Sequence, residues 1–206
     1  MCQAISLREW NRFAHRVIKG MQKRVVMIHG WGGTPDEGWR PWLKHELEKR
    51  EFLVHVPAMP DTMQPKMQEW VAYLAKIVHV PDTDCFLVGH SLGVVAILRY
   101  LATLEGDQKI CGAILIAGFT YDLGIPELSN FFKSPMPWEK IKKHCSKFVV
   151  IHSDNDPVVP FVQGEILRDK LGSEYIVVPN MRHFSGDDGI TEAPVILETI
   201  LHTARV

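Results

Sequence analysis

The stretch Cys85–Gly93 places the tightest restriction on how this chain folds. It reads Cys-Phe-Leu-Val-Gly-His-Ser-Leu-Gly, an apolar strand-forming run that ends in Gly-x-Ser-x-Gly. A sharp strand-to-helix turn leaves no room for a Cβ atom on either side of its exposed residue, so glycine stands two positions before and two after it. The apolar segment 94–103 that follows has the length of about three helical turns. We therefore predict a strand, a turn that presents Ser91, and a helix.

Composition and charge narrow the class of protein. With 206 residues, of which 46% are hydrophobic and 23% charged, residues 1–206 can form a single domain with a sizeable core. The formal net charge of -1 and the absence of a long basic block give no electrostatic support to a nucleic-acid partner. The apolar runs are shorter than the roughly 20 residues of a membrane helix, and the N-terminus lacks a signal peptide's apolar core. We expect a cytoplasmic protein with no membrane span; a homo-oligomer is possible but not indicated.

Cysteine and histidine spacing argues against a metal site. The four cysteines are scattered, at positions 2, 85, 111 and 145, and we interpret them as reduced thiols of the core or surface. Neither Cys-x-x-Cys nor His-Glu-x-x-His occurs, and the ten histidines form no tract with metal-ligand spacing. We expect no metal, and the chemistry considered below requires no cofactor.

Predicted strands and helices alternate along the chain. The strands are 24–28, 52–56, the run from 85 to the turn at 89–93, 109–118, 147–152 and 174–178. The helices are 39–50, 66–78, 94–103, 138–145, 161–171 and 192–203. Alternation with mostly short connections is typical of a parallel sheet with helices on both faces. The predicted fold class is therefore α/β, as a three-layer α/β/α sandwich with about six parallel strands.

Two segments fit this scheme less directly. Residues 1–20 carry apolar side chains at helical spacing and predict an amphipathic N-terminal extension, which packs on its own domain or serves a dimer or membrane surface. Residues 119–138 are rich in aromatic side chains and contain three prolines. This second segment is either a cap over a substrate or a surface loop whose aromatic side chains pack into the core.

The loop His29–Thr34 after the first strand is rich in glycine. It lacks the Gly-Lys-Ser/Thr ending of a phosphate-binding loop and the spacing of a dinucleotide fingerprint. It agrees better with a loop that contributes to an oxyanion hole. In that interpretation the backbone N–H groups of Trp31 and Leu92 hold the oxyanion. His29 then has a structural role in the loop.

A serine hydroxyl becomes a nucleophile only with a base, and the base needs a carboxylate to orient it. Chain order supplies Ser91, then Asp156 after a later strand, then His183 after the last strand. Asp154 competes for the middle role, but Asp156 begins an Asp-x-x-Val-Pro segment that leads into the next helix. We expect Asp154 to close its turn through its own backbone.

Other histidines compete with His183 for the role of base. His90 adjoins Ser91, but neighbours in such a turn are expected to point apart. His152 lies at a strand end, and His29 lies in the glycine-rich loop. We therefore predict that His183, in a loop after the final strand, is the base.

Together these motifs resemble those of serine hydrolases with the α/β-hydrolase fold. The resemblance rests on residues 29–33, 89–93, 156–160 and 182–184. The small size, the Trp-rich helix and the Met59-Pro60 loop are similar to the compact retinoblastoma-binding protein 9 (YdeN-like) group. The resemblance covers the chain from about Lys23 to its end. It implies a reduced α/β-hydrolase fold with little or no cap domain.

Three departures limit what the resemblance implies. Residues before Met21 have no counterpart that we can place, and Arg182 stands where a glycine often precedes the catalytic histidine. The Leu-x-Cys-x-Glu signature of retinoblastoma binding is absent. We therefore carry over the hydrolase chemistry and not that partner. Arg182 either faces solvent or steers an acidic substrate.

The sequence thus predicts a serine hydrolase of the carboxylesterase type. Its expected partners are a small-molecule acyl ester and water, and its expected intermediate is an acyl-enzyme. The predicted substrate-binding side chains are Trp31, Met59, Phe119 and Phe184. A small ester is favoured because there is no room for a large specificity domain. A thioesterase, a peptidase, and a binding module that keeps the fold without turnover remain alternatives.

Overall fold

A six-stranded parallel sheet forms the centre of the molecule. The computed structural model describes residues 22–205, and the helix predicted within residues 1–20 lies outside them. The strands follow the order β2-β1-β3-β4-β5-β6, and every neighbouring pair is parallel. The prediction of about six parallel strands is confirmed. Their bounds are β1 Arg24–Ile28, β2 Leu53–His55, β3 Cys85–His90, β4 Ile110–Ile116, β5 Cys145–Ser153 and β6 Glu174–Val178.

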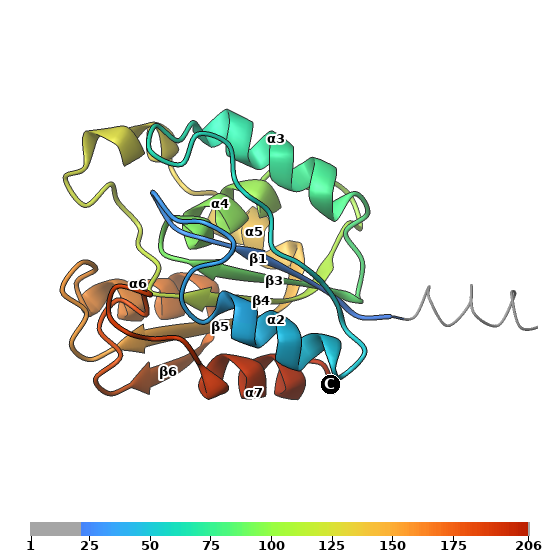
Figure 1. Ribbon diagram of the computed structural model, residues 1–206. Helices are drawn as coiled ribbons and strands as arrows, with labels where there is room; N and C mark the ends of the chain where they lie inside the picture. Colours follow the sequence, from blue (N-terminus) through green and yellow to red (C-terminus); the bar gives the residue numbers. More distant parts are fainter. Residues whose placement is uncertain (1–21, 206) are drawn as a thin grey trace, which may run out of the picture.

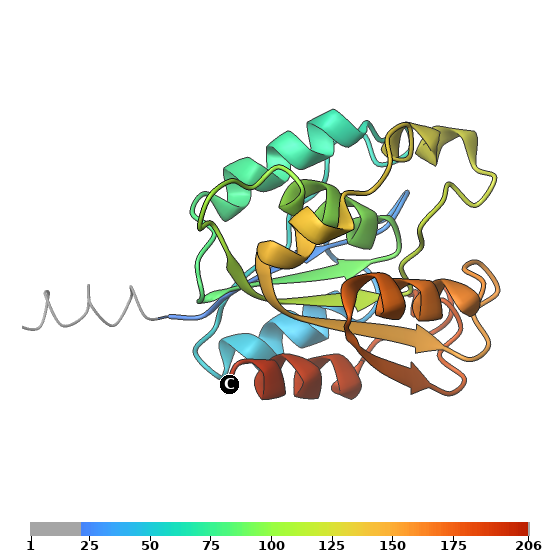
Figure 2. The same cartoon turned by 180° about the vertical axis from the view of Figure 1, so that it is seen from behind.

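Helices cover both faces of the sheet (Figures 1 and 2). One face carries α3 Met67–Val78, α4 Leu92–Leu101, α5 Trp138–Lys143 and α6 Val162–Leu171. The other face carries α2 Arg40–Glu48 and α7 Pro194–Thr203, which contact each other. The predicted three-layer α/β/α sandwich is therefore confirmed.

Local sequence explains where several elements begin and end. Both α2 and α7 have a proline in the first turn, where its fixed φ suits a helix and its missing N–H costs nothing. Helix α6 ends at Gly172, whose φ of 64° is left-handed. Strand β2 is shorter than predicted because the N–H of Phe52 still bonds to the carbonyl of Leu47, in the turn after α2.

Each face of the sheet has its own apolar core. In β1, Val25 and Met27 point toward α2 and α7, whereas Val26 and Ile28 point toward α3 and α4. All ten residues of α4 are buried. The helix that follows the predicted turn is therefore fixed on every side.

Segment 119–138 packs onto α4 through buried apolar side chains. It contains a short 3-10 helix, η1 Pro126–Phe131, and Phe119, Leu128 and Phe131 are all buried. The buried guanidinium of Arg99 on α4 donates to the carbonyls of Phe131 at 2.7 Å and Ser134 at 2.6 Å. The structure thus favours the second alternative for this segment, a loop whose aromatic side chains enter the core.

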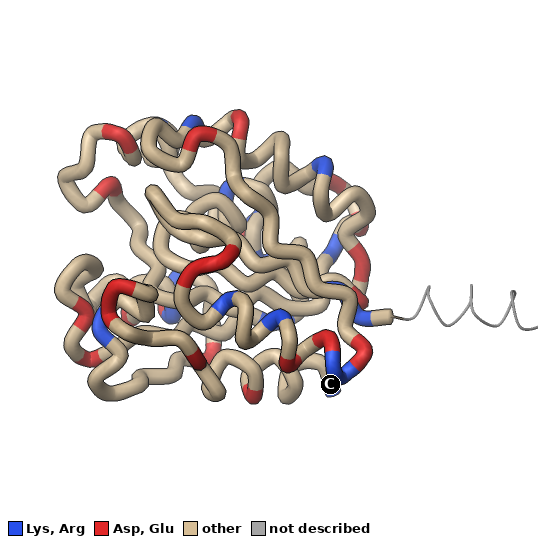
Figure 3. The backbone as a smooth tube through the Cα atoms, viewed as in Figure 1, with Lys and Arg blue, Asp and Glu red and all other residues tan. Residues whose placement is uncertain are grey.

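Acidic and basic positions are interspersed over the surface (Figure 3). Some form pairs within a helix, such as Lys44 with Glu48 one turn later. Among residues 22–205, no helix has both the length and the apolar character needed to cross a membrane.

We expect Arg99→Met to lower the free energy of unfolding by about 2 to 3 kcal/mol, because the carbonyls that Arg99 contacts lose a charged donor. Urea denaturation measures this loss. The control is Arg168→Met, which removes a half-exposed arginine paired with Asp169 and should leave the urea midpoint nearly unchanged. Equal effects of the two substitutions would contradict the anchoring role of Arg99.

Candidate active site

The candidate site lies between β1 and β3, where the order in which successive strands are added to the sheet changes direction. Strands β1 and β3 are neighbours, yet α2 follows β1 on one face and α4 follows β3 on the other. The last residue of β1, Ile28, is in register with Gly89, the next-to-last residue of β3. Such a switch point leaves a crevice at the carboxyl ends of the strands, the usual place for a ligand in an open α/β sheet.

Ser91 occupies the sharp turn between β3 and α4. Its φ of 55° and ψ of -120° are sparsely populated for a residue with a side chain. A Cβ atom at Gly89 would lie 2.8 Å from the carbonyl carbon of Gly93, and one at Gly93 would collide with the carbonyl oxygen of Ile28. The two glycines of the motif are therefore required by close packing, as the sequence predicted.

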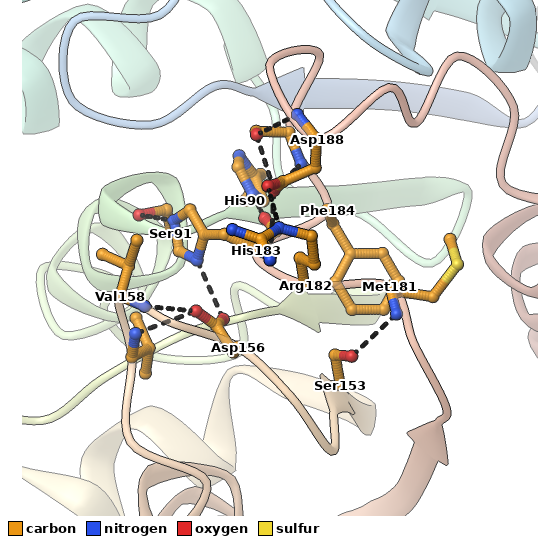
Figure 4. A network of polar contacts seen from close by, with 12 residues as sticks. His90, Ser91, Ser153, Asp156, Val158, Met181, Arg182, His183, Phe184 and Asp188 are labelled. Carbon is orange, nitrogen blue, oxygen red and sulfur yellow. Dashed lines mark hydrogen bonds and ion pairs between the residues drawn. The ribbon is translucent and has the colours of Figure 1, made fainter.

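His183 connects Ser91 to Asp156 (Figure 4). Its Nε2 lies 3.0 Å from the Oγ of Ser91, and its Nδ1 lies 2.8 Å from Oδ2 of Asp156. A carboxylate only accepts, so Nδ1–H is the donor and Nε2 is free to accept the serine proton. The other oxygen of Asp156 accepts the N–H groups of Val158 and Val159 at 2.8 and 2.9 Å. The three predicted residues are thus brought together in hydrogen-bonding order.

Side chains hold the backbone of the loop that carries His183. The four successive N–H groups of residues 180–183 donate to Asp154, Ser153, Asn155 and Asp188, at 2.9, 2.9, 2.8 and 3.0 Å in that order. Three of the loop's residues, 180, 182 and 184, have left-handed φ values of 60°, 46° and 55°. Such conformations persist only where their surroundings enforce them. The expectation that Asp154 bonds within its own turn is corrected, because its carboxylate reaches the loop after β6.

His90 and Trp39 also contact the loop that carries His183. The ring of His90 lies 4.9 Å from that of His183, and its Nε2–H donates to the carbonyl of His183 at 2.7 Å. The indole N–H of Trp39 donates to the carbonyl of Phe184 at 2.9 Å. Burial holds the pKa of His90 well below its ordinary value, and the neighbouring His183 lowers it further. His90 therefore supports His183, the predicted base, by contacting the ring and the carbonyl of that residue.

Asp188 is a residue of this site that the sequence analysis missed. Its carboxylate accepts Ser185 Oγ–H at 2.7 Å, Arg182 Nε–H at 2.8 Å and the N–H of His183. Burial raises the pKa of Asp188, but these hydrogen bonds outweigh it and lower the pKa to about 2. The sequence around Asp188 indicates only a turn, through the Asp-Gly pair that it begins.

The loop after β1 lies against Ser91. A Cβ atom at Gly30 would be 3.0 Å from the Cβ of Ser91. His29 donates through Nδ1 to the carbonyl of Gly30 at 2.9 Å and accepts the N–H of Met59 at 3.1 Å, so its ring braces the loop. Within residues 22–205, neither Trp31 nor Leu92 donates its backbone N–H to another residue. The assignment of these two N–H groups to an oxyanion hole stays a prediction.

A cavity of about 660 Å³ opens beside Ser91 and His183. Its wall is partly apolar and partly charged. The apolar side chains are Trp31, Met63, Pro157 and Val158, and the charged ones are Glu37, Arg40, Arg182, Asp187 and Asp188. Within residues 22–205, no group of three or more His, Cys, Asp or Glu side chains is arranged to hold a metal ion.

Of the four predicted substrate-binding side chains, only Trp31 lines this cavity. The prediction for Met59, Phe119 and Phe184 is corrected, since all three are buried in the two cores. The left-handed φ of Phe184 turns its ring toward the core beneath α2 and α7. Met63 lies on the wall, where its carbonyl accepts the indole N–H of Trp31.

Comparisons with known proteins agree on one family. The family described as Serine hydrolase matches residues 25–202. YdeN of Bacillus subtilis (strain 168) is 31% identical over 87% of this chain and 95% of its own length. The serine hydrolase RBBP9 of Rattus norvegicus is 28% identical over 80% of this chain and 87% of its own length.

Solved structures agree with this assignment. The crystal structure of the B. subtilis ydeN gene product superposes with a TM-score of 0.86, at 30% identity, over 90% of this chain and all of that one. Est1E from Butyrivibrio proteoclasticus has a TM-score of 0.70 at 15% identity, over 90% of this chain and 89% of its own. The second likeness shows the α/β-hydrolase fold alone.

We expect Asp188→Asn to lower the free energy of unfolding at neutral pH. A folded-state pKa of about 2, below the ordinary 3.8, contributes stability above pH 4 that is lost as the pH falls toward 2. Urea unfolding at several pH values should therefore show a difference from the wild type of about 2 kcal/mol at pH 6 that shrinks below pH 4. The control is Asp187→Asn, an exposed neighbour, and a difference that does not depend on pH would refute the role of the Asp188 charge.

Proposed function

Because the chain belongs to the serine hydrolase family, we propose that it hydrolyses small esters through a catalytic triad of Ser91, His183 and Asp156. The observation that carries the proposal is the position of His183, which reaches Ser91 with one ring nitrogen and a buried carboxylate with the other. This is the arrangement that activates a serine for acyl transfer. The cavity beside Ser91 gives a substrate access to the reacting atom.

In the acylation half-reaction, Oγ of Ser91 attacks the ester carbonyl carbon while Nε2 of His183 takes the hydroxyl proton. The negative charge passes to the carbonyl oxygen, and the N–H groups of Trp31 and Leu92 donate to it. Leu92 is the first residue of α4, so the positive end of the helix dipole also favours this charge. The imidazolium then protonates the leaving alkoxide, the carbonyl re-forms, and an acyl-enzyme remains.

In the deacylation half-reaction, a water molecule replaces the departed alcohol. His183 takes a proton from this water as its oxygen attacks the acyl carbon, and the same two N–H groups stabilise the second oxyanion. The imidazolium returns the proton to Oγ of Ser91 and the carboxylic acid leaves. Asp156 keeps the imidazole in the required tautomer and stabilises its positive charge in both half-reactions.

The form of the cavity favours a small ester over a peptide. Within residues 22–205, no residue of segment 119–138 lines the cavity wall, and its Phe119, Leu128 and Phe131 are buried in the core. We therefore infer that this segment is not a cap over the site, and a cavity of about 660 Å³ suits a small ester. The same chemistry acts on thioesters, and matched oxygen and sulfur esters of one acyl group would separate these two activities.

We expect a fluorophosphonate probe to label the folded wild-type protein at Ser91 and to leave Ser91→Ala unlabelled, because only an activated serine reacts with it. Mass spectrometry identifies the labelled residue. Ser146→Ala, which removes an exposed serine, should label as the wild type does. A folded wild-type protein that stays unlabelled would make the chain a binding module that keeps this fold.

We expect Asp156→Asn to lower kcat for ester hydrolysis by about 10³- to 10⁴-fold, because an amide favours the wrong imidazole tautomer. Asp154→Asn is the matched control, since within residues 22–205 the carboxylate of Asp154 bonds only to the backbone of Asn180. Asp154→Asn should lower the free energy of unfolding and leave kcat nearly unchanged. Steady-state kinetics on a phenyl ester, with circular dichroism to check folding, compare the two. The reverse ranking would assign the triad carboxylate to Asp154.

A further inference from the structure

A buried arginine forms part of the wall of the active-site cavity. Arg40 is the first residue of α2, and its side chain is only 4% exposed although it lines the same cavity as Ser91. Its charge reaches His29 and His90, and it contributes to lowering the pKa of both rings. A cation this deeply buried is screened by solvent far less than one on the surface.

The described residues accept hydrogen bonds from only some of the N–H groups of this guanidinium. A guanidinium has five N–H donors. Within residues 22–205, Nε of Arg40 donates to the carbonyl of Thr34 at 3.1 Å and Nη2 to Glu37 at 3.3 Å, and Nη1 has no acceptor. Glu37 is half exposed, and the same carboxylate oxygen also accepts the N–H of Thr34. The ion pair is therefore a single long contact and not a bidentate one.

The other charges on the wall are better compensated or more exposed. Asp188 is surrounded by donors from Ser185, Arg182 and His183. Arg182 is paired with that carboxylate and is 54% exposed, and Asp187 faces solvent. Arg40 is thus the wall charge that combines deep burial with unused donors. Within residues 22–205, no nitrogen of Arg40 is among the fully buried side-chain atoms that lack a partner, so its unused donors are accessible from the cavity that Arg40 lines. A ligand anion in the cavity could therefore pair with this largely buried charge.

We propose that Arg40 binds a carboxylate of the substrate, so that the site prefers esters that carry a second, anionic group. This inference rests on the proposed ester hydrolysis for its reaction. A planar carboxylate matches the fork of the guanidinium and accepts two parallel N–H groups from it. The apolar wall of Trp31, Met63 and Val158 would contact the hydrocarbon part of the same substrate. Substrates of this class include half-esters of dicarboxylic acids.

Binding to the Ser91→Ala protein tests the inference without turnover. Calorimetry compares monophenyl glutarate with phenyl valerate, which replaces the terminal carboxylate by a methyl group. A second pair, 4-acetoxybenzoate and 4-methylphenyl acetate, places the carboxylate on the leaving group. We expect the charged ester of at least one pair to bind about tenfold more tightly, the effect of one charge-assisted contact. The pair that shows it identifies the side of the ester that faces Arg40.

Substitutions in the Ser91→Ala background assign the preference to Arg40. Arg40→Gln should abolish it, and Arg40→Lys should retain part of it because the charge stays and the fork is lost. Glu37→Gln should strengthen it by removing the competing carboxylate. Lys44→Gln removes a positive charge from the exposed side of α2 and should leave the preference unchanged.

The outcomes separate this inference from the proposed function. No preference in either pair, or a preference that survives Arg40→Gln, would overturn it. If Arg40→Gln does not fold, the Glu37→Gln variant provides the test. A preference for the charged ester that is unchanged or weaker in Glu37→Gln would also overturn the inference. Wild-type protein that hydrolyses none of the four esters, beside a preference that depends on Arg40, would refute the proposed hydrolysis and leave the carboxylate site standing.

Discussion

The geometry of the site depends on the loop after β6, whose backbone N–H groups donate hydrogen bonds to side chains. After β6 the chain leaves the sheet, and its N–H groups need new acceptors. Four in succession find them: one in Ser153 at the end of β5, two in the loop after β5 and one in Asp188. The loop therefore has one register relative to β5, and Asp156 belongs to that same neighbouring loop. The distance between His183 and Asp156 is consequently fixed by the contacts that hold the backbone on either side of them.

The position of Ser91 depends on a different constraint, the close contact of backbone with backbone. Gly93 lies against the last carbonyl of β1, and Gly30 in the following loop lies against Ser91 itself. Because α4 is buried along its whole length, the turn has no room to relax. The proposed oxyanion donors, Trp31 and Leu92, directly follow Gly30 and Ser91 in these two closely packed segments. Packing therefore restricts the backbone on both sides of the serine.

The sequence was informative where local rules apply. Alternating strands and helices predicted the parallel sheet, the glycines predicted the turn at Ser91, and chain order selected Asp156 and His183. It failed for Met59, Phe119 and Phe184, because an apolar side chain suits a core and a pocket equally well. It also missed the support from Trp39, His90 and Asp188. The contacts of Trp39 and His90 join segments far apart in the sequence, and that of Asp188 lies within an irregular loop.

Each of the four consecutive polar side chains 153–156, at the end of β5 and in the loop after it, has its own partners. Ser153, Asp154 and Asn155 each accept one N–H of the loop after β6, and only Asp156 is left to face the ring of His183. Its other oxygen accepts two N–H groups of its own turn, which prevents the carboxylate from rotating. A carboxylate held in this way, with only 1% of its side chain exposed, presents a fixed charge to the imidazole. The turn that Asp156 begins therefore also orients the ring of His183, so one carboxylate both closes a turn and holds the imidazole.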